Sequence, residues 1–141
     1  SCFNETWTFL NKETLNTTER REMIALAHAS LFHWQQREDV EDSHLSIALW
    51  LLSRVYVKAN SPKESLRYAG DCFEISNKAG LEPFYIAYAY EALARSWSLN
   101  EDWSKVSTYM KSAHYLVTQI SEMSSRQVIL DDLATITNKI G

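Results

Sequence analysis

A pattern of large and small residues that returns after 41 positions limits what this chain can fold into. In the first copy the residues follow i, i+3, i+4, i+7 spacing, which is one face of an α-helix: Leu49, Leu52, Ser53 and Tyr56. The second copy has the same spacing and the same order of sizes: Tyr90, Leu93, Ala94 and Trp97. A repeat of this length predicts tandem units, each built from a pair of helices.

The segment that follows each copy agrees at the same offset and predicts the second helix of the pair. Its matching positions are Ser65, Ala69, Cys72 and Ser76 in the first unit, and Val106, Met110, Ala113 and Val117 in the second. A small residue facing a large one lets two helices pack closely. We therefore expect Leu52 and Leu93 in the core, and Ser53 and Ala94 where the helices cross.

Capping signals divide the whole chain into helices. Ser61 is expected as an N-cap, with Pro62 at the first helical position and Glu64 completing a capping box. Gly80 is placed to adopt a left-handed turn after the next helix, and Ser124 with Gln127 suggests another capping box. The expected helices are Phe3–Lys12, Thr18–Arg37, Ser43–Ala59, Pro62–Ala79, Pro83–Leu99, Glu101–Glu122 and Ser125–Lys139.

These units resemble tetratricopeptide repeats. The first helix of that motif carries a bulky residue, then Leu, a small residue and an aromatic, and its second helix carries small residues at the crossing. The match covers Leu49–Tyr56 with Ser65–Cys72, and Tyr90–Trp97 with Val106–Ala113. Ser53 and Ala94 stand where the motif usually has Gly, and the repeat is longer than the usual length of about 34 residues. Fragments such as Ala89–Arg95 also look like those of uncharacterised bacterial proteins of this helical kind.

The resemblance implies an all-α fold of antiparallel helical hairpins, stacked as a short right-handed solenoid. Residues 1–141 would form a single domain, which suits the size of the chain. The final helix would cap the stack.

Composition excludes several classes of function. Only three glycines are present and none are neighbours, so neither a P-loop nor a Rossmann turn can be built. A net charge of −4 gives no electrostatic reason to bind nucleic acid or an anionic membrane. Two isolated cysteines, Cys2 and Cys72, and the lack of a membrane-spanning run favour a cytoplasmic location.

No residue pattern predicts a metal, a cofactor or catalysis. His28 and His33 are five residues apart, about 140° around a helix, so they cannot face one ion together. Cys72 lies on the small-residue face of its helix, where close packing is its expected role. No serine lies in a nucleophile elbow. We therefore expect a protein that is not an enzyme.

A second stripe, one helical step from the repeat face, is the candidate binding surface. Its members are Ile47, Trp50, Arg54 and Lys58 on one helix, and Tyr88, Glu91, Arg95 and Leu99 on the other. In the tetratricopeptide family the corresponding wall is a concave groove that receives partner segments. Trp, Tyr and Arg also dominate binding hot spots. The competing interpretation is structural: Trp50 would be core, and Glu91 would pair with Arg54 or Arg95.

The favoured function is a regulatory or adaptor module that binds a protein or peptide. Trp50 and Tyr88 would provide flat aromatic contact surfaces, and Arg54, Lys58 and Arg95 would bind carboxylates of the partner. Glu91 can neutralise only one of Arg54 and Arg95, so a residual positive site is expected. Changing both arginines to Ala is expected to abolish binding with little loss of stability. His28 would add a titratable side chain to the groove if its helix faced that groove.

Two alternatives remain open at this point. One is a small-ligand or enzymatic pocket enclosed by the second, third and fifth helices, with His28, Arg54, Glu91 and Arg95 converging there. The other is a homo-oligomer formed through the aromatic surface.

Overall fold

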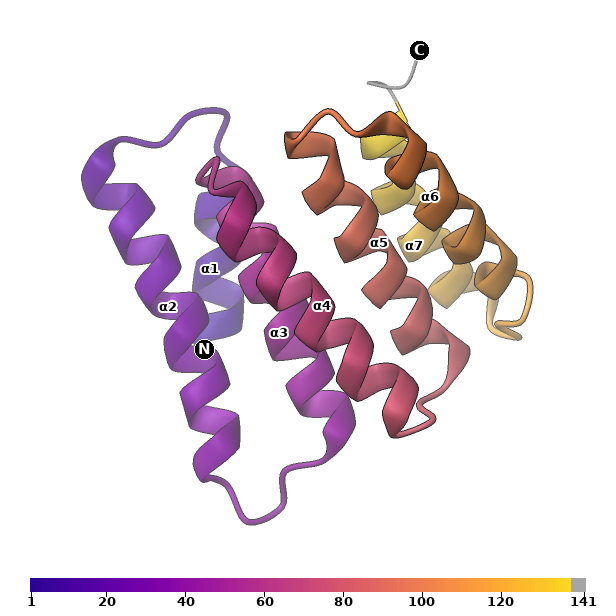
Figure 1. The fold of residues 1–141 in the computed structure, drawn as a ribbon. Coiled ribbons are helices and arrows are strands. Elements are labelled where there is room, and N and C mark those ends of the chain that lie inside the picture. Colours follow the sequence, from indigo (N-terminus) through magenta and orange to yellow (C-terminus); the bar gives the residue numbers. More distant parts are fainter. Residues whose placement is uncertain (138–141) are drawn as a thin grey trace.

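The chain is all-helical over residues 1–137, the part that the computed structural model describes, and this range contains no strand (Figure 1). Its helices are α1 (Cys2–Leu10), α2 (Thr17–Gln36), α3 (Asp42–Lys58), α4 (Pro62–Lys78), α5 (Pro83–Leu99), α6 (Trp103–Val117) and α7 (Met123–Thr137).

Helix boundaries follow the capping signals closely, except around α6. The expected span from Glu101 to Glu122 is too long at both ends. Glu101 has a left-handed φ of 55° and lies outside the helix, and Asp102 is the N-cap. At the other end the chain turns, with Ile120 N–H donating to the Val117 carbonyl (3.1 Å). The expected end of the last helix, Lys139, lies outside the described residues.

Two expected capping boxes do not form. Ser61 is the N-cap of α4 and Pro62 is the first helical residue, as expected, but the Ser61 side chain makes no capping hydrogen bond. Ser124 lies inside α7, where its hydroxyl donates to Glu122 Oε1 (2.6 Å). Gly80 does adopt the expected left-handed conformation, with φ of 62°.

The turns after α3 and α5 repeat each other. Asn60 (φ 58°) and Glu101 (φ 55°) are the left-handed residues, at equivalent positions of the two units. The next N–H in each case reaches back to a carbonyl of the last helical turn: Ser61 to Tyr56 (2.8 Å) and Asp102 to Trp97 (3.3 Å). These are Schellman-type closures, which satisfy carbonyls left over at a helix end. The same closure follows α4, where Gly80 is left-handed and Leu81 N–H donates to the Ser76 carbonyl (3.1 Å).

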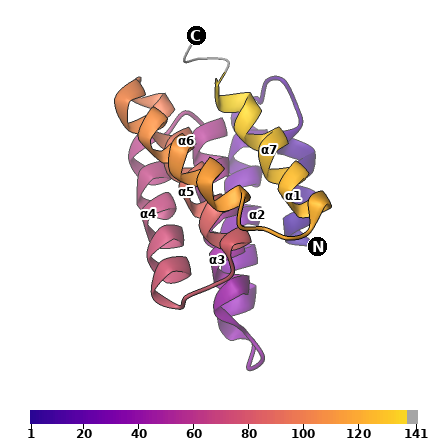
Figure 2. The same cartoon turned by 90° about the vertical axis from the view of Figure 1, so that its right-hand side faces the viewer.

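Each helix contacts the next along the chain, and α1, α3, α5 and α7 also contact one another in that order. Figure 2 shows α3 and α5 between α4 and α6 on one side and α1 and α7 on the other. Within the described residues no Cα atom of α1 lies within 8 Å of a Cα atom of α7. Both lie on the same side of α3 and α5, where α1 packs against α3 and α7 packs against α5.

The core consists of two adjoining clusters, one centred on α3 and α4 and the other on α5, α6 and α7. Leu52 is fully buried and Leu93 is 9% exposed, which confirms both as core residues. Ser53 and Ala94 are also buried, and the Ser53 hydroxyl donates to the Ser65 carbonyl of α4 (3.0 Å). Small side chains at these positions let the next helix approach.

Bulk at the small position of α5 should therefore be costly. We expect Ala94→Leu to lower the free energy of unfolding by about 1–3 kcal/mol through overpacking, because Ala94 is completely buried against the α6 cluster. Urea unfolding followed by circular dichroism measures the change. Ala25→Leu, on the exposed face of α2, is the matched control and should stay within about 0.5 kcal/mol of wild type. Equal stability of the two variants would contradict close packing at Ala94.

Candidate binding site

The carboxylate of Glu91 on α5 is fully buried and joins three side chains. Trp50 Nε1–H of α3 donates to Oε2 (2.6 Å), and Arg95 Nε–H donates to Oε1 (2.8 Å). Arg54 Nη1 of α3 also reaches Oε1 (3.5 Å). A buried carboxylate is tolerated only when it is paired and hydrogen-bonded. These contacts therefore hold α3 and α5 in register.

Asp132 connects α7 to the same cluster. Its Oδ2 accepts from the Tyr88 hydroxyl (2.7 Å), and its Oδ1 lies 3.8 Å from Arg54 Nη1. Arg95 Nη2 donates to the backbone carbonyl of Asp132 (3.0 Å) and to Thr135 Oγ1 (2.7 Å). Burial and the hydrogen bond to Asp132 raise the pKa of Tyr88 well above its usual value, so the hydroxyl remains a donor.

The expected residual positive charge is absent from this cluster. Arg54 and Arg95 face two carboxylates, Glu91 and Asp132, so the second guanidinium has a counter-ion. Burial lowers the pKa of Arg54, and the neighbouring charge of Arg95 lowers it further. The expectation was wrong because Asp132 is 41 residues away from Glu91 in sequence and reaches the cluster only through the docking of α7.

The expected effect of changing both arginines is corrected as well. Replacing Arg54 and Arg95 with Ala would leave the buried charge of Glu91 without a cation. An unpaired buried charge costs several kcal/mol. The double variant would therefore lose stability along with any binding.

Beside the polar cluster lies a pocket of about 430 Å³. Aromatic and aliphatic side chains make up most of its lining, with Ser46 and Asp132 as the polar members. The lining residues are Phe3, Trp7, Ser46, Ile47, Trp50, Phe84, Tyr85, Tyr88, Val128 and Asp132, which come from α1, α3, α5 and α7. Val128 at the rim is 52% exposed, and most of the rings are partly exposed. The pocket is therefore accessible from solvent.

The rings of the pocket are held by contacts with one another. The ring centroids of Trp50 and Tyr88 are 5.2 Å apart and those of Phe84 and Tyr88 are 5.3 Å apart, both in edge-to-face geometry. Trp7 tilts against Trp50 at 5.9 Å. Edge-to-face pairs of this kind stabilise ring positions beyond simple burial. The pocket is thus formed before any ligand enters.

The structure brings together most of the expected site residues. Trp50, Arg54, Glu91 and Arg95 contact one another between α3 and α5, and Tyr88 packs against Trp50. Of these five residues, Trp50 and Tyr88 line the pocket. The competing interpretation also holds in part, because Trp50 is 8% exposed and Glu91 pairs with both arginines.

Lys58 does not belong to this wall. Its ammonium contacts the backbone carbonyls of Lys12 and Glu13 in the loop between α1 and α2. It was placed in the stripe by helical spacing, but it is one full turn beyond Arg54 and meets a different segment.

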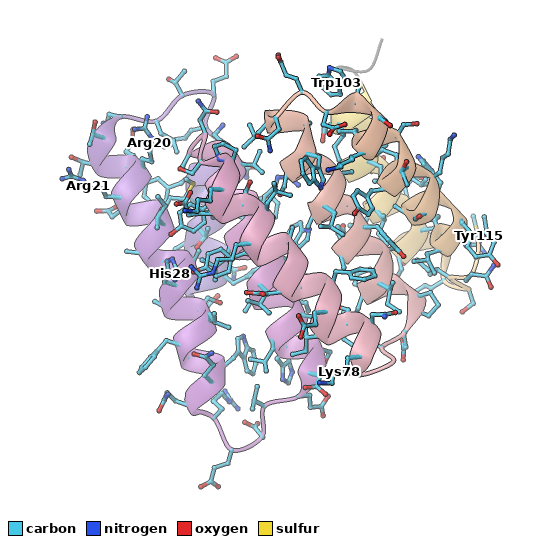
Figure 3. All side chains as sticks on the ribbon, in the orientation of Figure 1. Arg20, Arg21, His28, Lys78, Trp103 and Tyr115 are labelled. Atoms are coloured by element: carbon cyan, nitrogen blue, oxygen red, sulfur yellow. The ribbon has the colours of Figure 1, made fainter. Side chains whose placement is uncertain are left out.

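His28 lies in a separate cluster. Its Nε2 is 2.8 Å from the Tyr56 hydroxyl, and its ring packs edge-on against Tyr56 and Tyr68. Figure 3 shows it on the side of α2 that faces α4. His28 therefore contacts α3 and α4 residues and does not converge with Arg54, Glu91 and Arg95, as the alternative of a pocket between the second, third and fifth helices expected.

Seven pocket residues were missed from the sequence. Three are on α3 and α5, namely Ser46, Phe84 and Tyr85, and the other four form two pairs on the end helices: Phe3 and Trp7 on α1, and Val128 and Asp132 on α7. Each pair has i, i+4 spacing, which puts both members on one helix face. That spacing was a usable signal for a shared face. It could not predict that these faces of the first and last helices would line the same pocket.

Among the described residues no cluster of His, Cys, Asp or Glu could hold a metal ion, and no helix there is long and apolar enough to cross a membrane. Comparisons with protein-family models, with curated proteins and with solved structures found no match to this chain. Its function has to be inferred from the geometry of the pocket and of the cluster beside it.

The first prediction from this site concerns Glu91. We expect Glu91→Leu to lower the free energy of unfolding by about 3–5 kcal/mol, because Arg54 and Arg95 would lose a buried counter-ion. Urea unfolding of the variant and of wild type measures this difference in the free energy of unfolding. Glu74→Leu, at an exposed position of α4, is the control and should change stability by no more than about 0.5 kcal/mol. A near-neutral Glu91→Leu would mean that the buried carboxylate does not organise the site.

The second prediction from this site is a pH dependence of stability caused by His28. Burial lowers its pKa below 6.5, and the charge of Arg67 lowers it further. The folded state therefore binds fewer protons than the unfolded state near that pH, so the free energy of unfolding should fall as the pH drops below about 6.5. Urea unfolding at several pH values would show a shallower decline for His28→Gln. His33→Gln, at an exposed position of the same helix, should keep the wild-type decline. If wild type and both variants gave identical curves of stability against pH, the pKa of His28 would not be lowered by folding.

Proposed function

We propose that this chain is a tetratricopeptide-like interaction module that binds a segment of a partner protein in the pocket between α1, α3, α5 and α7. The observation that carries the proposal is the preformed aromatic pocket itself, about 430 Å³ in volume and accessible at a rim that includes Val128. Rigid aromatic rings offer a large contact area at low entropic cost, which is typical of binding hot spots.

Several features support the tetratricopeptide-like interpretation of the fold. The left-handed residues Asn60 and Glu101 close equivalent helices of the two units. Trp50 and Glu91, which occupy equivalent positions, contact each other directly across the α3–α5 interface. A stack of similar units predicts such contacts between equivalent positions. The pocket lies on the row of helices that the resemblance assigns to the concave face.

The polar cluster supports a binding role by making the wall of the pocket rigid. Glu91 fixes Trp50 from behind, and Asp132 fixes the Tyr88 hydroxyl. Both rings therefore keep their positions when the pocket is empty. A preorganised site spends less free energy on ordering when a partner binds.

A small apolar ligand is the second candidate, because 430 Å³ falls within the range of about 300–1,000 Å³ usual for small-molecule pockets. An enzymatic version of that pocket has less support. The Ser46 hydroxyl is 2.7 Å from Ser76 Oγ, so its partner is another hydroxyl where a nucleophile would need a base. We therefore propose binding without catalysis.

Blocking the pocket should abolish partner binding while leaving the fold intact. Val128→Trp would place a large ring at the exposed rim without disturbing the core. We expect peptides selected from a random library on the wild-type protein to bind this variant at least about tenfold more weakly, as expected for loss of a hot-spot anchor. Fluorescence anisotropy of the labelled peptides measures the affinities.

Phe32→Trp is the matched control, since Phe32 is 63% exposed on α2, away from the pocket. It should bind the selected peptides as wild type does. Equal binding by the Val128→Trp protein would show that peptides use another surface. If no peptide is selected but a small apolar fluorophore binds wild type and not Val128→Trp, the second candidate is the right one.

A further inference from the structure

The charge at the pocket wall is negative, opposite to the expectation from the sequence. Asp132 is the one charged residue among those lining the pocket, as far as the described chain goes. Its side chain is 24% exposed. Its short hydrogen bond comes from a neutral donor, the Tyr88 hydroxyl. The guanidinium of Arg54 stays 3.8 Å from Oδ1, beyond hydrogen-bond distance, so this carboxylate can accept from a ligand.

The two arginines of the cluster do not line the pocket. The side chains of Arg54 and Arg95 are 17% and 12% exposed, and both are engaged by the fully buried Glu91. Their charge is used to neutralise carboxylates. Of these charged groups, the one that an anionic ligand in the pocket would face directly is therefore Asp132.

The aromatic rings of the pocket, like the Asp132 carboxylate, attract cations. The faces of aromatic rings carry negative potential, and Trp and Tyr attract cations most strongly. Six aromatic rings line the pocket next to the carboxylate: Phe3, Trp7, Trp50, Phe84, Tyr85 and Tyr88. Arg54 already uses this attraction at the edge of the site, with its Cζ 5.7 Å from the Trp7 ring centroid. The overall charge of −4 also favours a basic partner.

Resting on the proposed function, we propose that the group received by this pocket is the alkylammonium side chain of a lysine in the partner segment. The four-carbon stem packs against the aromatic and aliphatic lining, and the ammonium lies among the ring faces and donates to Asp132. Lysine suits such a site because its stem is apolar and its charge is confined to the tip. The pocket thereby selects a basic segment and rejects an acidic one.

Three small probes test this proposal on the full chain: N-acetyl-lysine methylamide, its neutral Nε-acetyl derivative, and anionic N-acetyl-glutamate methylamide. Binding is followed by NMR through the indole N–H resonances of Trp7 and Trp50. We expect the lysine probe to bind about tenfold more tightly than the neutral derivative, in keeping with a cation–π contact reinforced by a carboxylate. The glutamate probe should bind most weakly.

Asp132→Asn then isolates the carboxylate. Asparagine keeps an oxygen that can accept from Tyr88, so the variant should fold. The lysine probe should lose most of its advantage on this variant, whereas the neutral derivative should bind as before and thereby show that the pocket is intact. Asp131→Asn, at the exposed neighbouring position where Asp131 accepts from Gln127, is the control and should keep the wild-type preference.

The outcomes separate this inference from the proposed function. If the neutral or the glutamate probe binds wild type as tightly as the lysine probe, the pocket is a binding site without selectivity for cations, and the inference is overturned alone. An unchanged lysine preference in Asp132→Asn would also overturn it. If no probe shifts the indole resonances and Val128→Trp leaves peptide binding unaffected, the proposed function fails as well. The comparison on wild type does not depend on any variant folding.

Discussion

The rest of the structure depends on the burial of one carboxylate. Glu91 lies in the interface between α3 and α5, where an ionised group is tolerated only if its partners hold it on several sides. Trp50, Arg54 and Arg95 do so, and each of them has a second role. Trp50 is a wall of the pocket, Arg54 covers Trp7, and Arg95 reaches the backbone of α7. The α3–α5 interface, the docking of α7 and the shape of the pocket are therefore linked through the same ion pairs.

This arrangement divides the site into two parts with different duties. In the ion pairs, two arginines face two carboxylates, so the charges nearly balance. The contribution of these pairs is to hold the side chains and helices in position. The apolar rings next to them present their faces and edges to the hollow, where a ligand can replace water. Asp132 belongs to both parts, because it accepts from Tyr88 and also lines the pocket. It is therefore the residue through which the structural cluster can influence what the pocket accepts.

Much of the fold could be predicted from the sequence because its signals are local. Pro62, Pro83 and Gly80 mark helix ends through their own backbone preferences, and α5 has the expected bounds. Ser53 and Ala94 were expected at helix crossings from their small size and their place in the repeat, and both are buried. The end of α6 was missed because the residues after Val117 continue to look helical, whereas the chain turns there to bring Ile120 into the core. Part of the site could be predicted too, since Trp50, Arg54, Glu91 and Arg95 share one stripe in two repeat units.

By itself, the sequence determined the helices apart from the ends of α6, the faces that α3, α4, α5 and α6 bury, and the meeting of the Trp50 stripe with the Glu91 stripe. All three follow from helical spacing and from a repeat of fixed length. Only the tertiary structure decided the sign of the charge that a ligand would meet. Phe3 and Trp7 from α1 and Asp132 from α7 come from opposite ends of the chain, and they line one hollow because both end helices pack on the same side of α3 and α5 (Figure 2). No local pattern encodes that juxtaposition, since it depends on how successive helix pairs are oriented when their large and small side chains interlock.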